Sequence, residues 1–409
     1  MTAPAGGHYH AEDGTFRKRT TPAGAAREIS GHAAAAAAGL PVPRLVGVLG
    51  LASGGCEVVY EDVFASGRAR WLIADAINAA DRDPGRAADV RALINAVCDA
   101  LHAAAAESGA FAPLAACVPA LYAARIAPGA RLDRWYARPP GPTWNLDRQL
   151  LGPAALRARS LIVNGHAYPS AWPVVLDQLR AELAPHTQWL TAITQGDVTE
   201  PNVAQAREPT SPAAPLCWLD FEHAGRNALA GDLANLTWYL LGMGGWLVPA
   251  YQPATYERTL RAPVPPAAAP VVDQLRVDDR RVSVDYTWRV GPGRHAAIEA
   301  LLRRLGGDLA TVLAPRGGDP MPLLRPFLAL RVLGVIPLSQ LSGPDALLCL
   351  AKLAELTTPG LATATWSRIT PAHPAASTAP VAGSERGLPG CQQLANPFAC
   401  VKPGMEGVP

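Results

Sequence analysis

The 409-residue sequence lacks the short motifs that identify several common enzyme classes. It contains no GxSxG, HExxH, GxxxxGK[ST] or GxGxxG segment, so no motif supports a serine hydrolase, a zinc protease, a P-loop nucleotidase or a dinucleotide-binding domain. It also has no internal repeat and no coiled-coil heptads. These absences leave the chemistry to be found in less common residue patterns.

An excess of charge of either sign is also missing. The 36 basic and 34 acidic residues give a formal charge of +2 and are spread along the chain, so no basic stripe indicates a nucleic-acid or membrane partner. The seven cysteines form no CxxC pair and have no histidines at zinc-binding spacing, which is typical of reduced thiols. The first residues lack the apolar core of a secretory signal, so we expect a cytoplasmic protein.

Long hydrophobic runs are scarce, and the longest stretch without a charge spans residues 233–256. It is long enough to raise the question of a membrane span. However, it contains Asn235, a glycine-rich run at 242–245 and Pro249, and it has no basic flank. The composition favours a buried core helix followed by a turn, with a membrane-associated segment as the alternative.

The remaining sequence predicts a mixed order of strands and helices. Residues 14–20 and 56–63 read as strands, separated by an alanine-rich helix over 23–38 that ends at Gly39 and Pro41. Alternation around Asp279 and Arg280 predicts a hairpin over 275–290. Apolar residues at helical spacing predict further helices over 71–109, 171–191, 294–314 and 322–356.

Polar residues gather between strand-like pieces in two neighbouring segments. Asp197 is followed five residues later by Asn202, and Asp220 lies in the next strand-like piece. Phosphoryl transfer needs a carboxylate that takes the proton of the attacking hydroxyl, oxygen ligands for Mg²⁺ and a cation on the nucleotide phosphates. The order and spacing of these three residues indicate that chemistry.

Three motifs in the same order resemble the aminoglycoside phosphotransferase and choline kinase family, within the protein-kinase-like superfamily. They are QGDVTEPN at 195–202, LDFEHAG at 219–225 and GDLA at 231–234. The resemblance implies that Asp197 is the catalytic base and that Asn202 and Asp220 bind magnesium. It also implies that Asp232 braces the catalytic loop.

The resemblance extends to the N-terminal part of the chain. Lys18 and Glu28 look like the ion pair that positions the α and β phosphates of ATP. Residues 60–63 look like the hinge that meets adenine, so Glu61 and Val63 are assigned to nucleotide binding. The family thus implies ATP and Mg²⁺ as cofactors and the hydroxyl of a small molecule as acceptor.

Two departures from the family pattern bear on activity. Gln195 replaces the usual histidine, although an amide can also donate and accept hydrogen bonds. Only 17 residues precede Lys18, too few for two strands and the glycine-rich turn that cover the phosphates. The alternative to an active kinase is therefore a catalytically impaired, kinase-like binding or regulatory protein.

The predicted fold is α+β and two-lobed, like a protein kinase. We expect an N-terminal nucleotide-binding lobe over 1–64, which the short N-terminus would leave truncated, and a mainly helical catalytic and substrate lobe over 65–360. Residues 361–409 have few large aliphatic side chains and are expected to form a disordered tail.

Two groups of residues leave alternatives open. The aromatic residues Trp135, Tyr136 and Trp144 are candidates for an acceptor pocket, with core packing as the favoured interpretation. His8 and His10 are candidates for metal ligands, but their place near the terminus favours no role.

Overall fold

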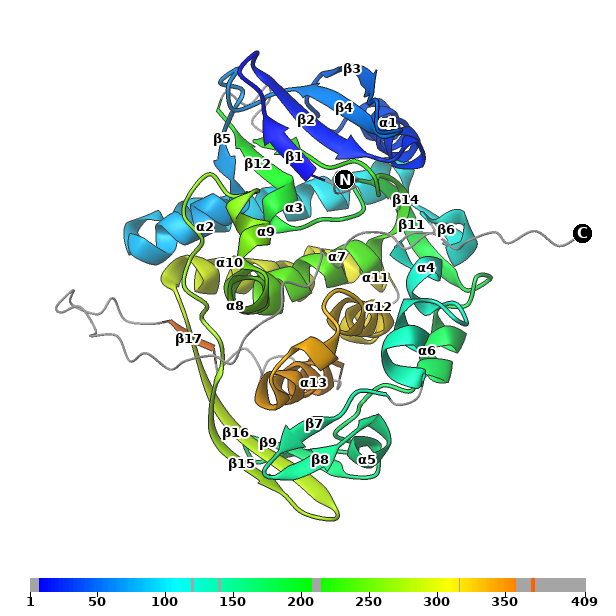
Figure 1. The fold of residues 1–409 in the computed structure, drawn as a ribbon, viewed down its shortest axis with the longest axis vertical. Helices are drawn as coiled ribbons and strands as arrows, with labels where there is room; N and C mark the ends of the chain where they lie inside the picture. Colours follow the sequence, from blue (N-terminus) through cyan, green and yellow to red (C-terminus); the bar gives the residue numbers. More distant parts are fainter. Residues whose placement is uncertain are drawn as a thin grey trace, which may run out of the picture.

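The computed structural model describes residues 7–118, 121–138, 141–207, 215–315, 317–357 and 369–371. A sheet-rich N-terminal lobe, shown in blue in Figure 1, lies against a larger, mainly helical lobe. The predicted α+β, two-lobed fold class is confirmed.

The N-terminal lobe is an antiparallel sheet with one helix. Its strand order is β1-β2-β4-β3. The strands are β1 (Gly7–His10), β2 (Thr15–Thr20), β3 (Leu45–Gly50) and β4 (Cys56–Glu61). Helix α1 (Pro22–Ala37) starts with Pro22 at its first position and with Thr21 accepting the Gly24 N–H, a favourable N-terminal cap. The predicted strands and helix are confirmed, whereas β1 and β3 were not predicted.

The lobe has a short hairpin before Lys18. β1 pairs with β2 through a turn at residues 11–14, where Gly14 has a φ of 75° that suits glycine. Among the described residues one strand, β1, precedes the strand of Lys18.

Two small three-stranded sheets join the lobes. One contains β14 (Gly225–Ala228), β11 (Gln188–Thr194) and β6 (Ala110–Pro113), and the other contains β13 (Leu216–Trp218), β12 (Val203–Ala206) and β5 (Ala69–Leu72). The chain passes between the sheets through α2 (Ile73–Arg82) and α3 (Ala87–Ser108), from β5 to β6, and through two short loops, over residues 195–202 and over residues 219–224. We call these two loops the 195–202 loop and the 219–224 loop. Because β11 pairs with β14 and β12 pairs with β13, the two loops lie side by side.

The helical lobe packs around the uncharged stretch. Figure 1 shows α7 crossing the middle of this lobe, in contact with α12. The stretch forms α7 (Leu229–Trp238), a π-helical segment (Tyr239–Leu247) and α8 (Val248–Tyr251), nearly all buried. The predicted buried helix is confirmed. None of the described helices combines the length and apolar character needed to cross a membrane.

Several predicted helices are shorter than expected because proline or glycine interrupts them. The sequence 171–191 was predicted as one helix, but α6 covers Leu176–Glu182 and Pro185 separates it from β11. The helices predicted over 71–109, 294–314 and 322–356 each divide in two, at Pro84, at Gly306 and between Gly334 and Gly343. The resulting helices are α2 (Ile73–Arg82), α3 (Ala87–Ser108), α10 (Pro292–Leu305), α11 (Asp308–Leu313), α12 (Met321–Gly334) and α13 (Gly343–Thr357).

The predicted hairpin is present as β15 (Val271–Val277) and β16 (Arg281–Val290).

Strand β17 (Ile369–Pro371) pairs with β16, so the expectation of disorder is wrong for these three residues. The rest of the predicted tail lies outside the described residues. The remaining strands and α-helices are β7 (Trp144–Leu146), β8 (Gln149–Leu151), β9 (Ser160–Val163), β10 (His166–Tyr168), α4 (Ala123–Ile126), α5 (Pro153–Arg157) and α9 (Pro253–Glu257).

Aromatic residues of the connecting region contribute to the core. The Tyr136 hydroxyl donates to the Leu333 carbonyl at 2.8 Å, and the Trp144 indole donates to the Leu338 carbonyl at 2.9 Å. Both side chains are buried, so the interpretation of core packing holds for them. Trp135 is half-buried and lies under the guanidinium of Arg131.

Candidate active site

Gln195 holds the two loops together at the base of the site. Its side-chain NH₂ donates to the carbonyls of Leu219 (2.9 Å) and Asp220 (2.6 Å), and its oxygen accepts the Asp197 N–H (2.9 Å). The side chain is almost completely buried. Glutamine thus provides both donor and acceptor contacts at the position where the family usually has histidine.

Gly196 is required by the close approach of the same loops. Its φ is 82°, in the left-handed region that favours glycine. A Cβ atom at this position would lie 2.1 Å from the His223 carbonyl oxygen of the 219–224 loop. Any larger residue would force the loops apart.

The Asp197 carboxylate is held by amide groups and one guanidinium. Oδ1 accepts from Asn235 Nδ2 at 2.9 Å and lies 3.3 Å from Arg331 Nη1. Oδ2 accepts from Asn202 Nδ2 at 3.2 Å. The side chain of Asp197 remains 28% exposed, so an acceptor can reach a carboxylate whose orientation is already fixed.

Asn202 is oriented by the same contacts. Its Nδ2 atom donates to the main-chain oxygen and to the side chain of Asp197. Asn202 also lines the pocket that contains Lys18 and Asp220. The Leu219 N–H donates to the Asn202 carbonyl at 2.9 Å, which sets Asn202 beside the start of the 219–224 loop.

Lys18 connects the N-terminal sheet to both Glu28 and Asp220. Its Nζ atom lies 2.7 Å from Glu28 Oε2 and 2.5 Å from Asp220 Oδ1. Burial alone would lower the pKa of Lys18, but the charges of Asp220 and Glu28 raise it above its ordinary value. The ammonium group therefore stays charged in a largely buried position.

Glu28 joins three elements through its two oxygens. Oε2 pairs with Lys18 on β2, and Oε1 accepts from the Tyr60 hydroxyl on β4 and from the Phe221 N–H, each at 3.0 Å. Since Glu28 itself lies on α1 and is 1% exposed, it fixes the helix, the sheet and the 219–224 loop relative to one another.

Asp220 has a strained backbone and a stabilised charge. Its φ of 59° is unusual for a residue other than glycine, and such strain is concentrated at functional sites. Burial would raise the pKa of Asp220, but Lys18 holds it below its ordinary value. The charge of Asp220 and then burial raise the pKa of the neighbouring Glu222, whose carboxylate lies 3.9 Å from Lys18 Nζ.

Asp232 contacts the strand that leads into the 195–202 loop. Its Oδ2 atom accepts from the Thr194 hydroxyl at 2.6 Å, and burial raises the pKa of Asp232 to about 7. Its Oδ1 atom has no hydrogen-bond partner among the described residues. The contact fixes the last residue of β11, directly before Gln195.

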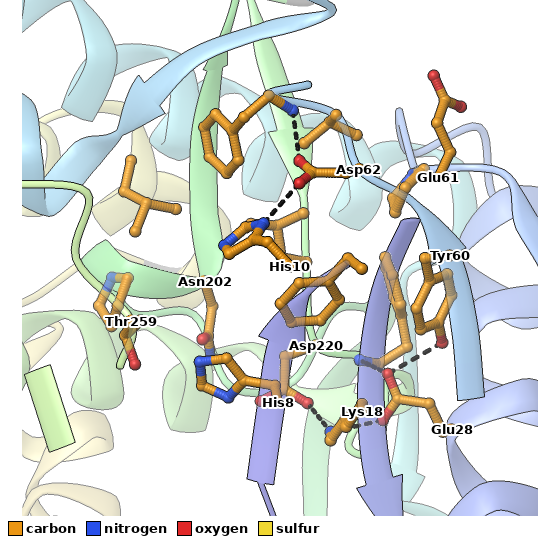
Figure 2. Close-up of a pocket in the computed structure, with 18 residues that line it drawn as sticks. His8, His10, Lys18, Glu28, Tyr60, Glu61, Asp62, Asn202, Asp220 and Thr259 are labelled. Atoms are coloured by element: carbon orange, nitrogen blue, oxygen red, sulfur yellow. Dashed lines mark hydrogen bonds and ion pairs between the residues drawn. The ribbon is translucent and has the colours of Figure 1, made fainter. Parts of the chain in front are cut away.

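The predicted nucleotide-binding and metal-binding residues line one pocket between the lobes (Figure 2). They are Lys18, Glu28, Glu61, Val63, Asn202 and Asp220. The Glu61 carboxylate pairs with Arg68 at 3.0 Å, and the Val63 carbonyl accepts the Ala69 N–H at 2.8 Å. Asp197 does not line this pocket and is linked to it through Asn202.

Two histidines that the sequence analysis left without a role also line the pocket. His8 and His10 alternate along β1 and therefore project from the same face of the sheet. His10 Nδ1 lies 2.5 Å from Asp62 Oδ2, and His8 Nε2 donates to the Arg258 carbonyl at 2.7 Å. Figure 2 shows His8 close to Lys18, Asp220 and Asn202. The two-residue spacing of His8 and His10 could have indicated that both side chains lie on one face of a strand. Their place near the terminus instead favoured the interpretation that they have no role.

Among the described residues, no group of three or more His, Cys, Asp and Glu side chains is arranged to hold a metal ion. The pocket does provide an amide oxygen from Asn202 and a carboxylate from Asp220. Mg²⁺ is commonly held by one or two such protein oxygens, with phosphate oxygens and water completing its octahedron. The donor set therefore fits a magnesium ion that arrives with a nucleotide.

Comparison with known proteins gave matches to solved structures alone. No protein-family model matches the chain, and no curated protein sequence matches it. An amicoumacin kinase solved with AMP-PNP, Ca²⁺ and Ami matches over 87% of this chain and 86% of that one, with 13% identity and a TM-score of 0.40.

Two further solved structures match the chain. An aminoglycoside phosphotransferase from Streptomyces rimosus matches over 58% of this chain and 75% of that one, with 16% identity and a TM-score of 0.34. A choline/ethanolamine kinase family protein from Mesorhizobium loti matches over 86% of this chain and 93% of that one, with 15% identity and a TM-score of 0.28.

Proposed function

We propose that this protein is an ATP- and Mg²⁺-dependent phosphotransferase that moves a γ-phosphate to a hydroxyl of a small molecule. The observation that carries the proposal is the joint contact of Lys18 with Glu28 and Asp220, next to a loop that holds Asp197 in a fixed orientation. These are the cation, metal ligand and base that phosphoryl transfer requires.

In this proposal each residue has a distinct role. Asp197 orients the acceptor hydroxyl and takes its proton, while Asn235 and Asn202 hold the carboxylate in place. Lys18 contacts the nucleotide phosphates. Asn202 and Asp220 would hold a magnesium ion, which would neutralise charge on the nucleotide phosphates. Most of the acceleration comes from positioning and from this electrostatic stabilisation.

The nucleotide base would lie at the opposite end of the same pocket. Phe16, Leu72 and Leu219 line the pocket with apolar surface, and the segment Glu61–Val63 runs along it. An apolar slot with a few polar groups is typical of a cofactor site. A cytoplasmic location is part of the proposal, because the five cysteines in the described part of the chain are free.

Replacing Asp197 with Asn tests the assignment directly. The substitution keeps the shape and one of the two oxygen acceptors but removes the proton acceptor, so phosphate transfer should fall about 10²- to 10⁴-fold. The rise in melting temperature caused by ATP and Mg²⁺ should persist, because the nucleotide pocket is unchanged. Undiminished transfer by this variant would remove Asp197 from its role.

The second candidate is a kinase-like binding or regulatory protein without activity. It is favoured by the N-terminal hairpin that lines the pocket, where His10 pairs with Asp62. If this alternative holds, ATP with Mg²⁺ will not raise the melting temperature of the purified protein. A clear rise combined with transfer would exclude it.

A further inference from the structure

A buried arginine on α4 lies close to Asp197. Arg125 on α4 is 8% exposed, and two of its guanidinium nitrogens, Nε and Nη1, are buried with no hydrogen-bond partner among the described residues. Such a group loses its hydration without compensation, which is strongly unfavourable. Binding of an anionic ligand would offset this loss of hydration.

Arg125 belongs to a group of three arginines. Its side chain lies against Gly334, since a Cβ atom there would be 3.5 Å from Arg125 Cδ. Arg131 donates to the Gly334 carbonyl at 2.7 Å. Arg331, one helical turn before Gly334 on α12, reaches Asp197 Oδ1 at 3.3 Å. The group therefore extends from α4 to the carboxylate of Asp197.

The electrostatic coupling agrees with this geometry. Burial, followed by the charges of Arg331 and Arg131, lowers the pKa of Arg125, and Asp197 acts in the opposite direction. The three guanidinium groups thus repel one another within range of a single carboxylate.

Three other carboxylates near the 195–202 loop and α4 are engaged elsewhere. Glu200 receives two hydrogen bonds from Arg294, and Asp133 pairs with Arg180. Asp232 faces Thr194. Asp220 and Glu222 of the 219–224 loop lie beside Lys18, so Arg125 and Arg331 have Asp197 as the carboxylate that they share.

We infer that the acceptor subsite beside Asp197 is cationic, and that the hydroxyl acceptor carries a carboxylate or a phosphate group bound by Arg125 and Arg331. A guanidinium presents parallel N–H donors that match both anionic groups. A polycationic acceptor would be repelled by the same three arginines. The inference rests on the proposed phosphotransferase function and narrows its acceptor.

The binding test uses the full chain without nucleotide. Inorganic phosphate and acetate are titrated separately into the protein, and the melting temperature is measured. The parent protein carries Lys18→Met, which removes the cation of the nucleotide pocket, and every variant in this test is made in that parent. At least one anion should stabilise the protein, and Arg125→Met should weaken that binding about tenfold or more, as expected for loss of a buried charged partner. The anion that responds shows whether the subsite takes phosphate or carboxylate.

One control variant and one control measurement accompany the binding test. Arg134→Met removes an exposed arginine from the segment that follows α4 and should leave anion binding unchanged. Arg125→Met should melt at the same temperature as its parent or higher when no anion is present, because it removes an uncompensated buried charge. Anion-induced shifts that are absent, or equal in the Arg125→Met protein and its parent, would overturn the inference.

The transfer test separates this inference from the proposed function. With ATP and Mg²⁺, the wild-type chain should phosphorylate glycerol 3-phosphate or glycerate in preference to choline and glucosamine. Transfer to the cationic compounds alone would retain the kinase and reject the cationic subsite. Anion binding through Arg125 without any nucleotide binding would retain the subsite and reject the kinase.

Discussion

At the scale of single residues, Gln195 shows how a departure from a family pattern can preserve loop geometry. The amide donates twice and accepts once, and all three contacts are made in a buried position. A neutral histidine has one donor and one acceptor. Glutamine therefore connects the 195–202 loop and the 219–224 loop through one more contact than neutral histidine can make.

Replacing Gln195 with Ala should expose this role. The change leaves the Asp197 N–H and two carbonyls without their partner, which should lower the free energy of unfolding by about 1–3 kcal/mol and reduce transfer as Asp197 loses its orientation. Denaturant unfolding and kcat measure the two effects. Gln178→Ala, at an exposed position, is the control. A Gln195→Ala protein as stable and as active as its parent would contradict the assignment.

Asp232 predicts a pH dependence of stability. Its pKa in the folded protein is raised to about 7, above the ordinary value of 3.8, so the unfolded chain releases the proton at lower pH. The contribution of Asp232 to stability is therefore complete below about pH 4 and is lost as the pH rises towards 7. Asp232→Asn, which does not titrate, should remove this decline from the melting temperature measured between pH 4 and pH 8. Parallel pH curves for the two proteins would argue against the raised pKa.

At the scale of elements, the strands, helices and loops that could be predicted are those whose pattern lies within a short continuous segment of the sequence. The motifs around Asp197 and Asp220 are short and continuous, and the strand of Lys18 and helix α1 follow local patterns. The long helices were predicted without their breaks, because glycine and proline decide these breaks one residue at a time. Contacts between distant segments, such as that of Arg125 with Gly334, leave no local signal.

Gly31 is an example of such a contact, between α1 and the 219–224 loop. A Cβ atom at Gly31 would lie 2.0 Å from the Phe221 carbonyl oxygen, which is main chain and cannot turn away. The absence of a side chain therefore lets α1 approach the loop closely enough for Glu28 to accept the Phe221 N–H.

Gly31→Ala should thus be destabilising, although alanine usually favours a helix over glycine by about 1 kcal/mol. We expect a loss of about 1–3 kcal/mol from overpacking, together with weaker binding of ATP and Mg²⁺ because Glu28 shifts away from Lys18. Denaturant unfolding and nucleotide-induced melting shifts measure the two effects. Ser30→Ala, exposed on the same helix, should change neither. A stabilised Gly31→Ala protein would show that the loop can move freely.

At the scale of the whole molecule, a buried ion pair connects the 195–202 loop to the distant helix α10. Arg294 Nη1 lies 2.7 Å from Glu200 Oε2, and Arg294 Nη2 lies 2.9 Å from Glu200 Oε1. Both side chains are at most 3% exposed. Gly244 leaves room for the pair, since a Cβ there would clash with Glu200 Oε1. Because α10 also contacts α2 and α3, the pair ties the loop to the helical lobe.

Glu200→Ala should therefore destabilise the protein by about 3–5 kcal/mol, because it leaves Arg294 charged and buried without a partner. The double variant Glu200→Leu with Arg294→Met should recover much of this loss, since it removes both charges together and keeps apolar volume. Glu299→Ala, which breaks the exposed pair with Arg303, should change the free energy of unfolding by less than about 1 kcal/mol. Denaturant unfolding of the four proteins completes the comparison. If the single and double variants lose equal stability, the pair acts through packing around the 195–202 loop rather than through charge.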